Sequence, residues 1–189
     1  MTPDQDVTVK GLPVRSLQNF IERELTAGQR DAAFCNLPPA YAARLKEQIL
    51  PTETVPVAML NRLTEEAARA RGESLEDFGR RAGCAAATDA IHGVYRFFAL
   101  ALTPAALLTK GGQLWTSVYS RGQLVVQDQT STSARLVLQD FKSEPAGCAR
   151  ITGWIEKMAE LTGVTVLQLV HDQCSARGAK SCEWELRWK

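Results

Sequence analysis

The side chains best suited to chemistry are three cysteines and a histidine in the C-terminal part of the chain. His171, Cys174 and Cys182 follow the pattern His-x2-Cys-x7-Cys, and Cys148 precedes them. Three thiolates and one imidazole are a donor set that holds structural zinc in tetrahedral geometry and leaves no coordination position open. The residue types therefore favour a zinc site that stabilises the fold and does not catalyse a reaction.

The surrounding pattern predicts elements that would bring these four residues together. Residues 164–170 are rich in β-branched side chains, and residues 182–189 alternate apolar with charged side chains. Two such runs predict an antiparallel hairpin, with His171 ending its first strand and Cys182 beginning its second. Cys148 lies near the start of the helix predicted just before, where the helix dipole favours a thiolate.

Two other interpretations of the cysteines stay open at this point. Cysteine is among the most frequently buried residue types, so these thiols could simply be packed in the core. A disulfide between Cys174 and Cys182 is the second alternative. The chain has five cysteines, an odd number, and a reducing compartment disfavours the disulfide.

The composition of the chain is that of an ordinary globular protein. It has 189 residues, of which 45% are hydrophobic and 23% charged, with a formal net charge of +1. We expect one domain over residues 1–189, with residues 1–8 flexible. The low net charge argues against nucleic-acid binding. The apolar stretch at residues 95–108 is too short for a membrane span, and no secretory signal is evident, so we expect a cytoplasmic protein.

Periodicity predicts a helical first half and a mixed second half. Helical spacing is found in residues 16–26, 41–50, 57–71, about 74–102, 104–119 and 145–161, and short strand patterns are found in residues 124–126 and 135–138. We therefore predict an α+β fold. Its helical N-terminal half packs on a small antiparallel sheet of about four strands that ends in the C-terminal hairpin.

The middle of the longest predicted helix is made of small residues, at positions 82–87. Small side chains let two helix backbones approach closely, either within the chain or between two copies of it. The second case would make a homodimer, weakened by Ala86→Leu. Cys84 lies in this stretch, and we interpret it as a small buried side chain in preference to an acylated one.

Several segments, in order, resemble a myxobacterial paralogous family of unknown function. The matching pieces are Val9-Lys10-Gly11, Leu37-Pro38-Pro39, Phe78-Gly79-Arg80, Gly93-Val94-Tyr95-Arg96, Leu114-Trp115 with Tyr119 and Gly122, Gly153-Trp154, and His171-x2-Cys174 with Gly178, Cys182 and Trp188. The second half also resembles the vinyl-reductase-type sensor domain, which belongs to a larger group with the heme-nitric-oxide-binding domains and the TRAPP tethering subunits.

This resemblance implies helices packed on an antiparallel sheet, an internal apolar cavity and frequent dimerisation. In the phenol sensors that carry the domain, a Cys before the last helix and an acid-x2-Cys-x7-Cys hairpin hold zinc. The matching positions here are Cys148, His171, Cys174 and Cys182, with His171 in place of the acid. The phenol-binding His and Trp have no evident counterpart, so an aromatic ligand is not implied.

The function expected from these features is the binding of a hydrophobic small molecule by a regulatory domain, without enzymatic activity. The expected pocket residues are aromatic or apolar, together with one histidine: His92, Tyr95, Phe98, Leu102, Trp115 and Tyr119. We interpret His92 as a hydrogen-bonded helix residue, so heme is not expected. The alternative is a homodimeric scaffold that resembles the tethering subunits, binds an unidentified protein partner and takes no small ligand.

Overall fold

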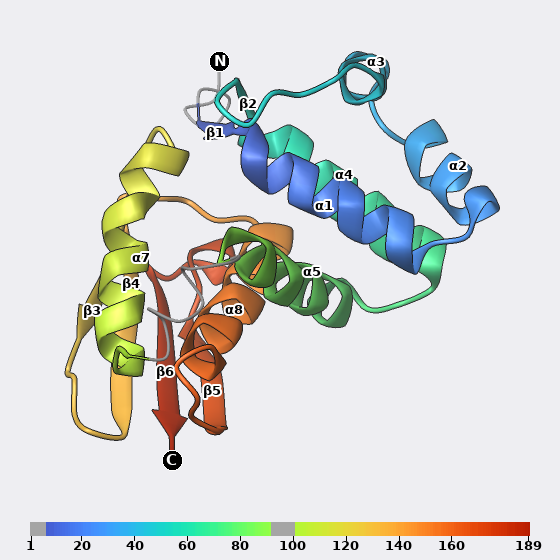
Figure 1. Ribbon diagram of the computed structural model, residues 1–189. Helices are drawn as coiled ribbons and strands as arrows, with labels where there is room; N and C mark the ends of the chain where they lie inside the picture. Colours follow the sequence, from blue (N-terminus) through green and yellow to red (C-terminus); the bar gives the residue numbers. More distant parts are fainter. Residues whose placement is uncertain (1–6, 92–100) are drawn as a thin grey trace.

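The computed structural model describes residues 7–91 and 101–189, which form an α+β fold. Helices dominate the N-terminal half, and a four-stranded sheet with its covering helices forms the C-terminal half (Figure 1). The N-terminal elements are β1 (Thr8–Lys10), α1 (Gly11–Glu24), α2 (Ala27–Cys35), α3 (Pro39–Lys46), β2 (Thr54–Pro56), α4 (Val57–Arg71) and α5 (Leu75–Ala90). The C-terminal elements are α7 (Pro104–Val118), β3 (Gln123–Gln127), β4 (Ser133–Gln139), α8 (Pro145–Glu160), β5 (Val166–Gln173), the short 3-10 helix η2 (Ser175–Arg177) and β6 (Cys182–Trp188).

The main sheet is antiparallel throughout, with the strand order β3-β4-β6-β5. The predicted C-terminal hairpin is confirmed, because β5 and β6 pair with His171 opposite Trp184. Strand β6 alternates as its sequence requires: Cys182, Trp184, Leu186 and Trp188 are buried, while the residues between them are half-buried or exposed. Since β6 lies in the middle of the sheet, its apolar face supplies the floor of the core.

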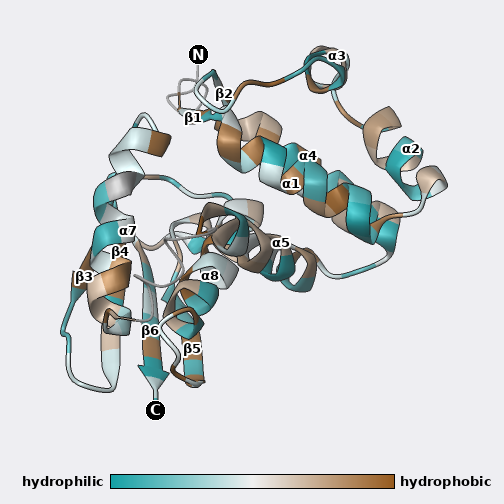
Figure 2. Cartoon of the chain, in the orientation of Figure 1, coloured by the Kyte–Doolittle hydropathy of each residue, from teal (hydrophilic) through white to brown (hydrophobic). Residues whose placement is uncertain are grey.

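Helices α7 and α8 cover one face of this sheet (Figure 1). The core between them contains the fully buried Trp184, Leu136, Leu138 and Ile155. Helix α5 packs along α8 and joins this half to the N-terminal helices α1 and α4. On those two helices apolar positions alternate with polar ones, as Figure 2 shows, so each buries one face and leaves the other to solvent.

The contact between α5 and α8 depends on glycines. A Cβ added to Gly83 would lie against the backbone carbonyl of Arg150, and one added to Gly153 would lie against that of Arg80. A bidentate ion pair between Arg80 and Glu156, with N–O distances of 2.7 and 2.6 Å, lies beside this contact. The small-residue stretch is therefore used within the chain, as the first of the two interpretations predicted.

A half-buried arginine connects α8 with α4. The guanidinium of Arg150 donates to Thr64 Oγ1 at 2.5 Å and to Asn61 Oδ1 at 2.7 Å. Asn61 in turn donates to Glu144 Oε2 at 2.8 Å, at the residue that precedes α8. Desolvation lowers the pKa of Arg150 from its ordinary value, with nearby negative charges opposing the shift. The start of α8 is thus held against the N-terminal half by hydrogen bonds as well as by apolar packing.

Some predicted boundaries differ from those observed. The helix predicted at residues 41–50 begins at Pro39 and ends at Lys46, well before Pro51. The helix predicted to reach about residue 102 ends at Ala90. Its remaining predicted part falls largely on residues 92–100, outside the described residues. Strand β1 begins at Thr8, inside the segment expected to be flexible. Within the parts of the chain described here, no helix is long and apolar enough to cross a membrane.

Filling the glycine contact between α5 and α8 should destabilise the protein. We expect Gly153→Ala to lower the free energy of unfolding by about 2 kcal/mol, because the added methyl must push the two helices apart. The matched control is Gly28→Ala in α2, where a Cβ would meet nothing within 4 Å and where stability should stay equal or rise slightly. Urea unfolding monitored by circular dichroism measures both, and equal stability of the two variants would contradict the packing account.

Candidate metal centre

Four potential metal ligands from two regions of the sequence meet at one end of the sheet. Cys148 lies in the first turns of α8, His171 near the end of β5, Cys174 directly after β5 and Cys182 at the start of β6. One ligand atom from each residue lies within 4.8 Å of the others. We call this group the Cys3His cluster. The structure thus brings together all four residues proposed as ligands, and they come from the elements that were expected to position them.

The sulfur atoms of the cluster cysteines lie in contact with one another without being bonded. Cys148 Sγ lies 3.7 Å from both Cys174 Sγ and Cys182 Sγ. A disulfide requires about 2.05 Å, and all five cysteines of the chain are free. Zinc–sulfur bonds of about 2.3 Å in tetrahedral geometry place two sulfurs about 3.8 Å apart. Cys174 and Cys182 are therefore not joined by a disulfide in this structure, and the two distances from Cys148 match the edge of a zinc–thiolate tetrahedron.

His171 is held in position by the neighbouring strand. Its ring stacks on that of Trp184 with centroids 4.6 Å apart and an angle of 8° between the planes. Trp184 is fully buried, and its Nε1 donates to Thr152 Oγ1 at 2.8 Å, so the platform beneath the imidazole is itself fixed. The Nε2 atom of His171 is buried without a hydrogen-bond partner among the described residues. A buried ring nitrogen without a partner is costly, and a metal ion would satisfy it.

A serine outside the cluster supports one of its sulfurs. Ser175 approaches Cys182 Sγ with its backbone nitrogen at 3.3 Å and its hydroxyl at 3.2 Å, and its Oγ also accepts from Ser143 N at 3.0 Å. Hydrogen bonding from Cys148, followed by that from His171 and Ser175, lowers the pKa of Cys182. The same contact with Cys182, together with burial, raises the pKa of Cys148. The site thus favours at least one thiolate, which is the form that binds metal.

The roles of Ser143 and Ser175 beside the Cys3His cluster were not predicted from the sequence. Neither serine belongs to a ligand motif, and their roles arise from the tertiary contact between the loop before α8 and the turn after β5. The predicted hairpin requires a turn between β5 and β6. Gly178 lies in that turn and adopts a positive φ of 95°, a conformation that favours glycine. A serine directly after a ligand cysteine is the only sequence signal for Ser175, and it is a weak one.

The predicted ligand-pocket residues are only partly described by the structure. His92, Tyr95 and Phe98 lie outside the described residues, and Leu102 is half-buried against the core. Trp115 and Tyr119 do lie together, with stacked rings whose centroids are 4.2 Å apart.

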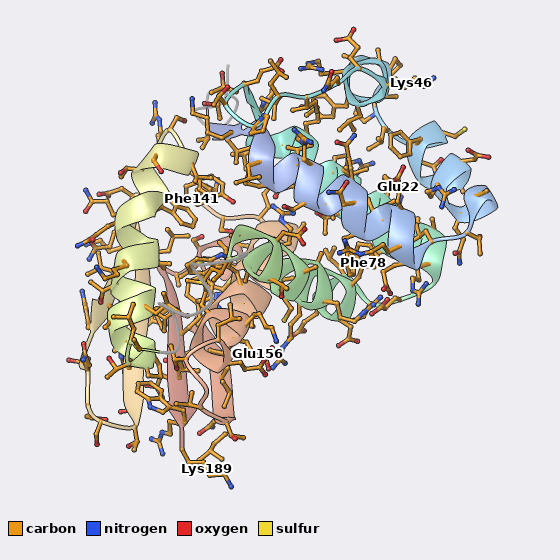
Figure 3. The ribbon with its side chains drawn as sticks, in the orientation of Figure 1. Glu22, Lys46, Phe78, Phe141, Glu156 and Lys189 are labelled. Atoms are coloured by element: carbon orange, nitrogen blue, oxygen red, sulfur yellow. The ribbon has the colours of Figure 1, made fainter. Side chains whose placement is uncertain are left out.

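A third ring completes this aromatic group. Phe141 packs edge-on against both Trp115 and Tyr119, with centroid distances of 5.3 and 5.6 Å. Figure 3 labels Phe141 beside α7. Burial raises the pKa of Tyr119, which the charge of Arg150 partly offsets. We call Trp115, Tyr119 and Phe141 the aromatic wall. Trp115 and Tyr119 were expected from the sequence and Phe141 was not, and a ligand pocket beside this wall stays a prediction.

The chain was compared with family models, curated proteins and solved structures. No family model and no curated protein matches it. Solved structures of H-NOX proteins do match, at low identity. An H-NOX protein from S. oneidensis in the Fe(II)NO ligation state has a TM-score of 0.71 and 12% identity, over 95% of this chain and 99% of that one. A structure probing heme distortion in the H-NOX family has a TM-score of 0.71 and 14% identity, over 95% of each chain.

A third solved structure also has a similar fold. An oxygen-binding H-NOX domain related to soluble guanylate cyclases, in its oxygen complex, has a TM-score of 0.65 and 12% identity, over 95% of this chain and 92% of that one. Identities this low establish the fold alone. The chain therefore shares the fold of these H-NOX proteins. No match supports the myxobacterial family, and the likeness to vinyl-reductase and TRAPP domains stays a prediction.

These neighbours correct the expectation about heme. Heme was not expected from the sequence, whereas the solved proteins that share the fold include heme and Fe(II) proteins. Heme iron in proteins is held by His, Cys, Met or Tyr. Of the two histidines of this chain, His171 faces the three thiols. The described residues therefore do not offer heme a histidine ligand outside the Cys3His cluster, and His92 is the histidine that remains to be tested.

Cys84 should react slowly with alkylating agents. Burial, and then the charges of Glu156 and Glu160, raise its pKa to about 11, so about one molecule in a thousand carries the thiolate at pH 8. Exposed Cys35 is the internal comparison. We expect iodoacetamide at pH 8 to label Cys35 at least about tenfold faster than Cys84, as measured by peptide mass spectrometry. Equal labelling of the folded protein would contradict the described burial, and the difference should vanish in urea.

Proposed function

We propose that this chain is a non-enzymatic ligand-binding regulatory domain in which a structural zinc ion holds the C-terminal hairpin against α8. The observation that carries the proposal is the convergence of four ligand atoms within 4.8 Å of one another. All four protein ligands are present, so the site would be closed to substrate. Such a metal contributes folding free energy rather than catalysis.

The donor chemistry of the site supports zinc over other ions. Three sulfurs and one nitrogen exclude the oxygen-rich coordination that calcium and magnesium prefer. Thiolates at tetrahedral spacing are typical of zinc or of iron–sulfur centres, and the imidazole completes the Cys3His set found in structural zinc sites. The pairing of His171 with Trp184 fixes the imidazole orientation before any metal binds.

The regulatory role is supported by the fold and by the aromatic wall. Proteins with this fold bind NO and oxygen, as their solved structures describe. In this chain a ligand would lie near Trp115 and Tyr119, with Leu102, His92, Tyr95 and Phe98 as further proposed contacts. Sensor activity would require a partner to receive the signal.

A homodimeric scaffold is the weaker proposal. Its main motivation was the small-residue stretch of α5, and that surface packs on α8 of the same chain. No other described feature favours two copies over one.

Native mass spectrometry beside the denatured mass tests the zinc proposal. We expect the freshly purified protein to carry one zinc that is lost in acid and absent from Cys174→Ser. Cys35→Ser, at an exposed cysteine, is the matched control and should retain the metal. His171→Asp should retain zinc better than His171→Ala, because a carboxylate can replace the imidazole. A native mass without metal in both wild type and Cys35→Ser would overturn the proposal.

The ligand proposal has its own measurement. Absorbance spectra of the same preparation, with and without added hemin, test heme directly, since bound heme gives a Soret band. Ligation by His92 predicts that the band shifts or disappears in His92→Ala and persists in His171→Ala. An unidentified organic mass retained in the native spectrum would instead favour another small molecule. The absence of both a Soret band and a retained mass would count against the ligand-binding proposal.

A further inference from the structure

A hollow opens beside the Cys3His cluster, at the end of the sheet where several loops gather. Its volume is about 400 Å³, within the range of small-molecule sites. The lining comes from the segment before β1, the loop from α7 to β3, the loop from β4 to α8 and the turn between β5 and β6. It consists of Val7, Arg121, Asp140, Phe141, Lys142, Ser175, Ala179 and Lys180.

The charged residues of this lining are unbalanced. Arg121, Lys142 and Lys180 contribute three positive charges, and Asp140 contributes one negative charge. Each cation comes from a different loop, so the excess of positive charge is created by the fold and does not follow from a basic run in the sequence. The chain as a whole has a formal net charge of only +1, which makes this concentration of cations a local feature.

The base of the hollow is apolar and fixed. Phe141 is 9% exposed and packs edge-on against Trp115 and Tyr119. Asp140, just before it, has a positive φ of 52°, an uncommon conformation for a residue other than glycine. This conformation occurs at the corner where the chain leaves β4 toward α8. A packed aromatic side chain in the same lining as three cations is suited to a ligand with an anionic head and a flat apolar part.

The hollow also shares a residue with the cluster. Ser175 lines the hollow, and its hydroxyl lies 3.2 Å from Cys182 Sγ and accepts from Ser143 N. A ligand oxygen that competes for this hydroxyl would alter the hydrogen bonding of a cluster sulfur. Ser175 therefore belongs both to the lining of the hollow and to the hydrogen bonding of the Cys3His cluster.

We propose that this hollow binds a small anionic ligand, a carboxylate or phosphate held by Arg121, Lys142 and Lys180, over the aromatic floor of Phe141. This site adjoins the aromatic wall of the proposed function through Phe141, but it does not require a ligand to bind in that apolar pocket. It does not require zinc either, because its cations lie on loops outside the cluster. Its failure and the failure of the zinc proposal are thus distinguishable.

Isothermal titration calorimetry on the full chain tests the proposal, with inorganic phosphate and benzoate as separate probes. We expect saturable 1:1 binding of at least one probe at about millimolar affinity or tighter. Preferential binding of benzoate would identify a carboxylate on an apolar body, whereas preferential binding of phosphate would identify a phosphate group. Affinity should fall as sodium chloride is raised, because the binding cations are exposed to solvent.

Two variants and a control make the test specific. Arg121→Gln combined with Lys180→Gln should weaken binding about tenfold or more. Ala179→Glu, which places a carboxylate in the hollow, should abolish it. Lys46→Gln neutralises an exposed cation on α3, which Figure 3 shows far from the lining residue Phe141, and should bind as the wild type does. The metal content of each variant should be unchanged. No binding of either probe, or equal affinity in all variants, would overturn the proposal.

Discussion

The convergence of three buried thiols and one imidazole is the constraint on which the C-terminal half depends. Cys148 lies in the first turn of α8. The other three ligands lie near the end of β5, directly after it and at the start of β6. The cluster thus ties the helix that covers the sheet to the hairpin that forms its edge. Cys148 Sγ lies 3.7 Å from two other sulfurs, and His171 Nε2 has no hydrogen-bond partner among the described residues. A zinc ion would satisfy all of these atoms together.

The same helix carries the connection to the rest of the protein. Gly153 lets α5 approach α8, and Arg150 donates to Thr64 and Asn61 of α4. The residue before α8, Glu144, accepts from Asn61, four positions before the first cluster ligand. A change at the cluster would therefore act on a helix that touches both halves of the molecule. In the proposed regulatory domain, this helix is the element through which a local binding event would act on both halves.

The parts of the fold that could be predicted are those with strong local patterns. The alternation in β6 was enough to place Trp184 and Cys182 on the buried face, and the helical period of residues 57–71 matches the bounds of α4. Helix α2 was missed although Thr26 and Gln29 form a capping box, because the helix buries little and its apolar period is weak. Strands β1 and β2 have three residues each, too few to show a period.

The ligand set of the cluster followed from residue type and spacing, whereas its surroundings did not. Nothing local indicates that Ser175 supports Cys182 or that Arg121, Lys142 and Lys180 border one hollow, because those contacts depend on how loops meet in three dimensions. Heme was set aside on the sequence of this chain alone. The likeness of the fold to heme proteins became visible only through the backbone, at identities of 12–14%.

X-ray absorption at the zinc edge of the purified protein tests the central claim most directly. The account predicts a first shell of three sulfurs at about 2.3 Å and one nitrogen at about 2.0–2.1 Å, without a bound water. In His171→Asp the nitrogen should be replaced by an oxygen while the three sulfurs remain. A first shell of nitrogen and oxygen only, or no zinc at the edge, would contradict the claim that the Cys3His cluster is a structural zinc centre.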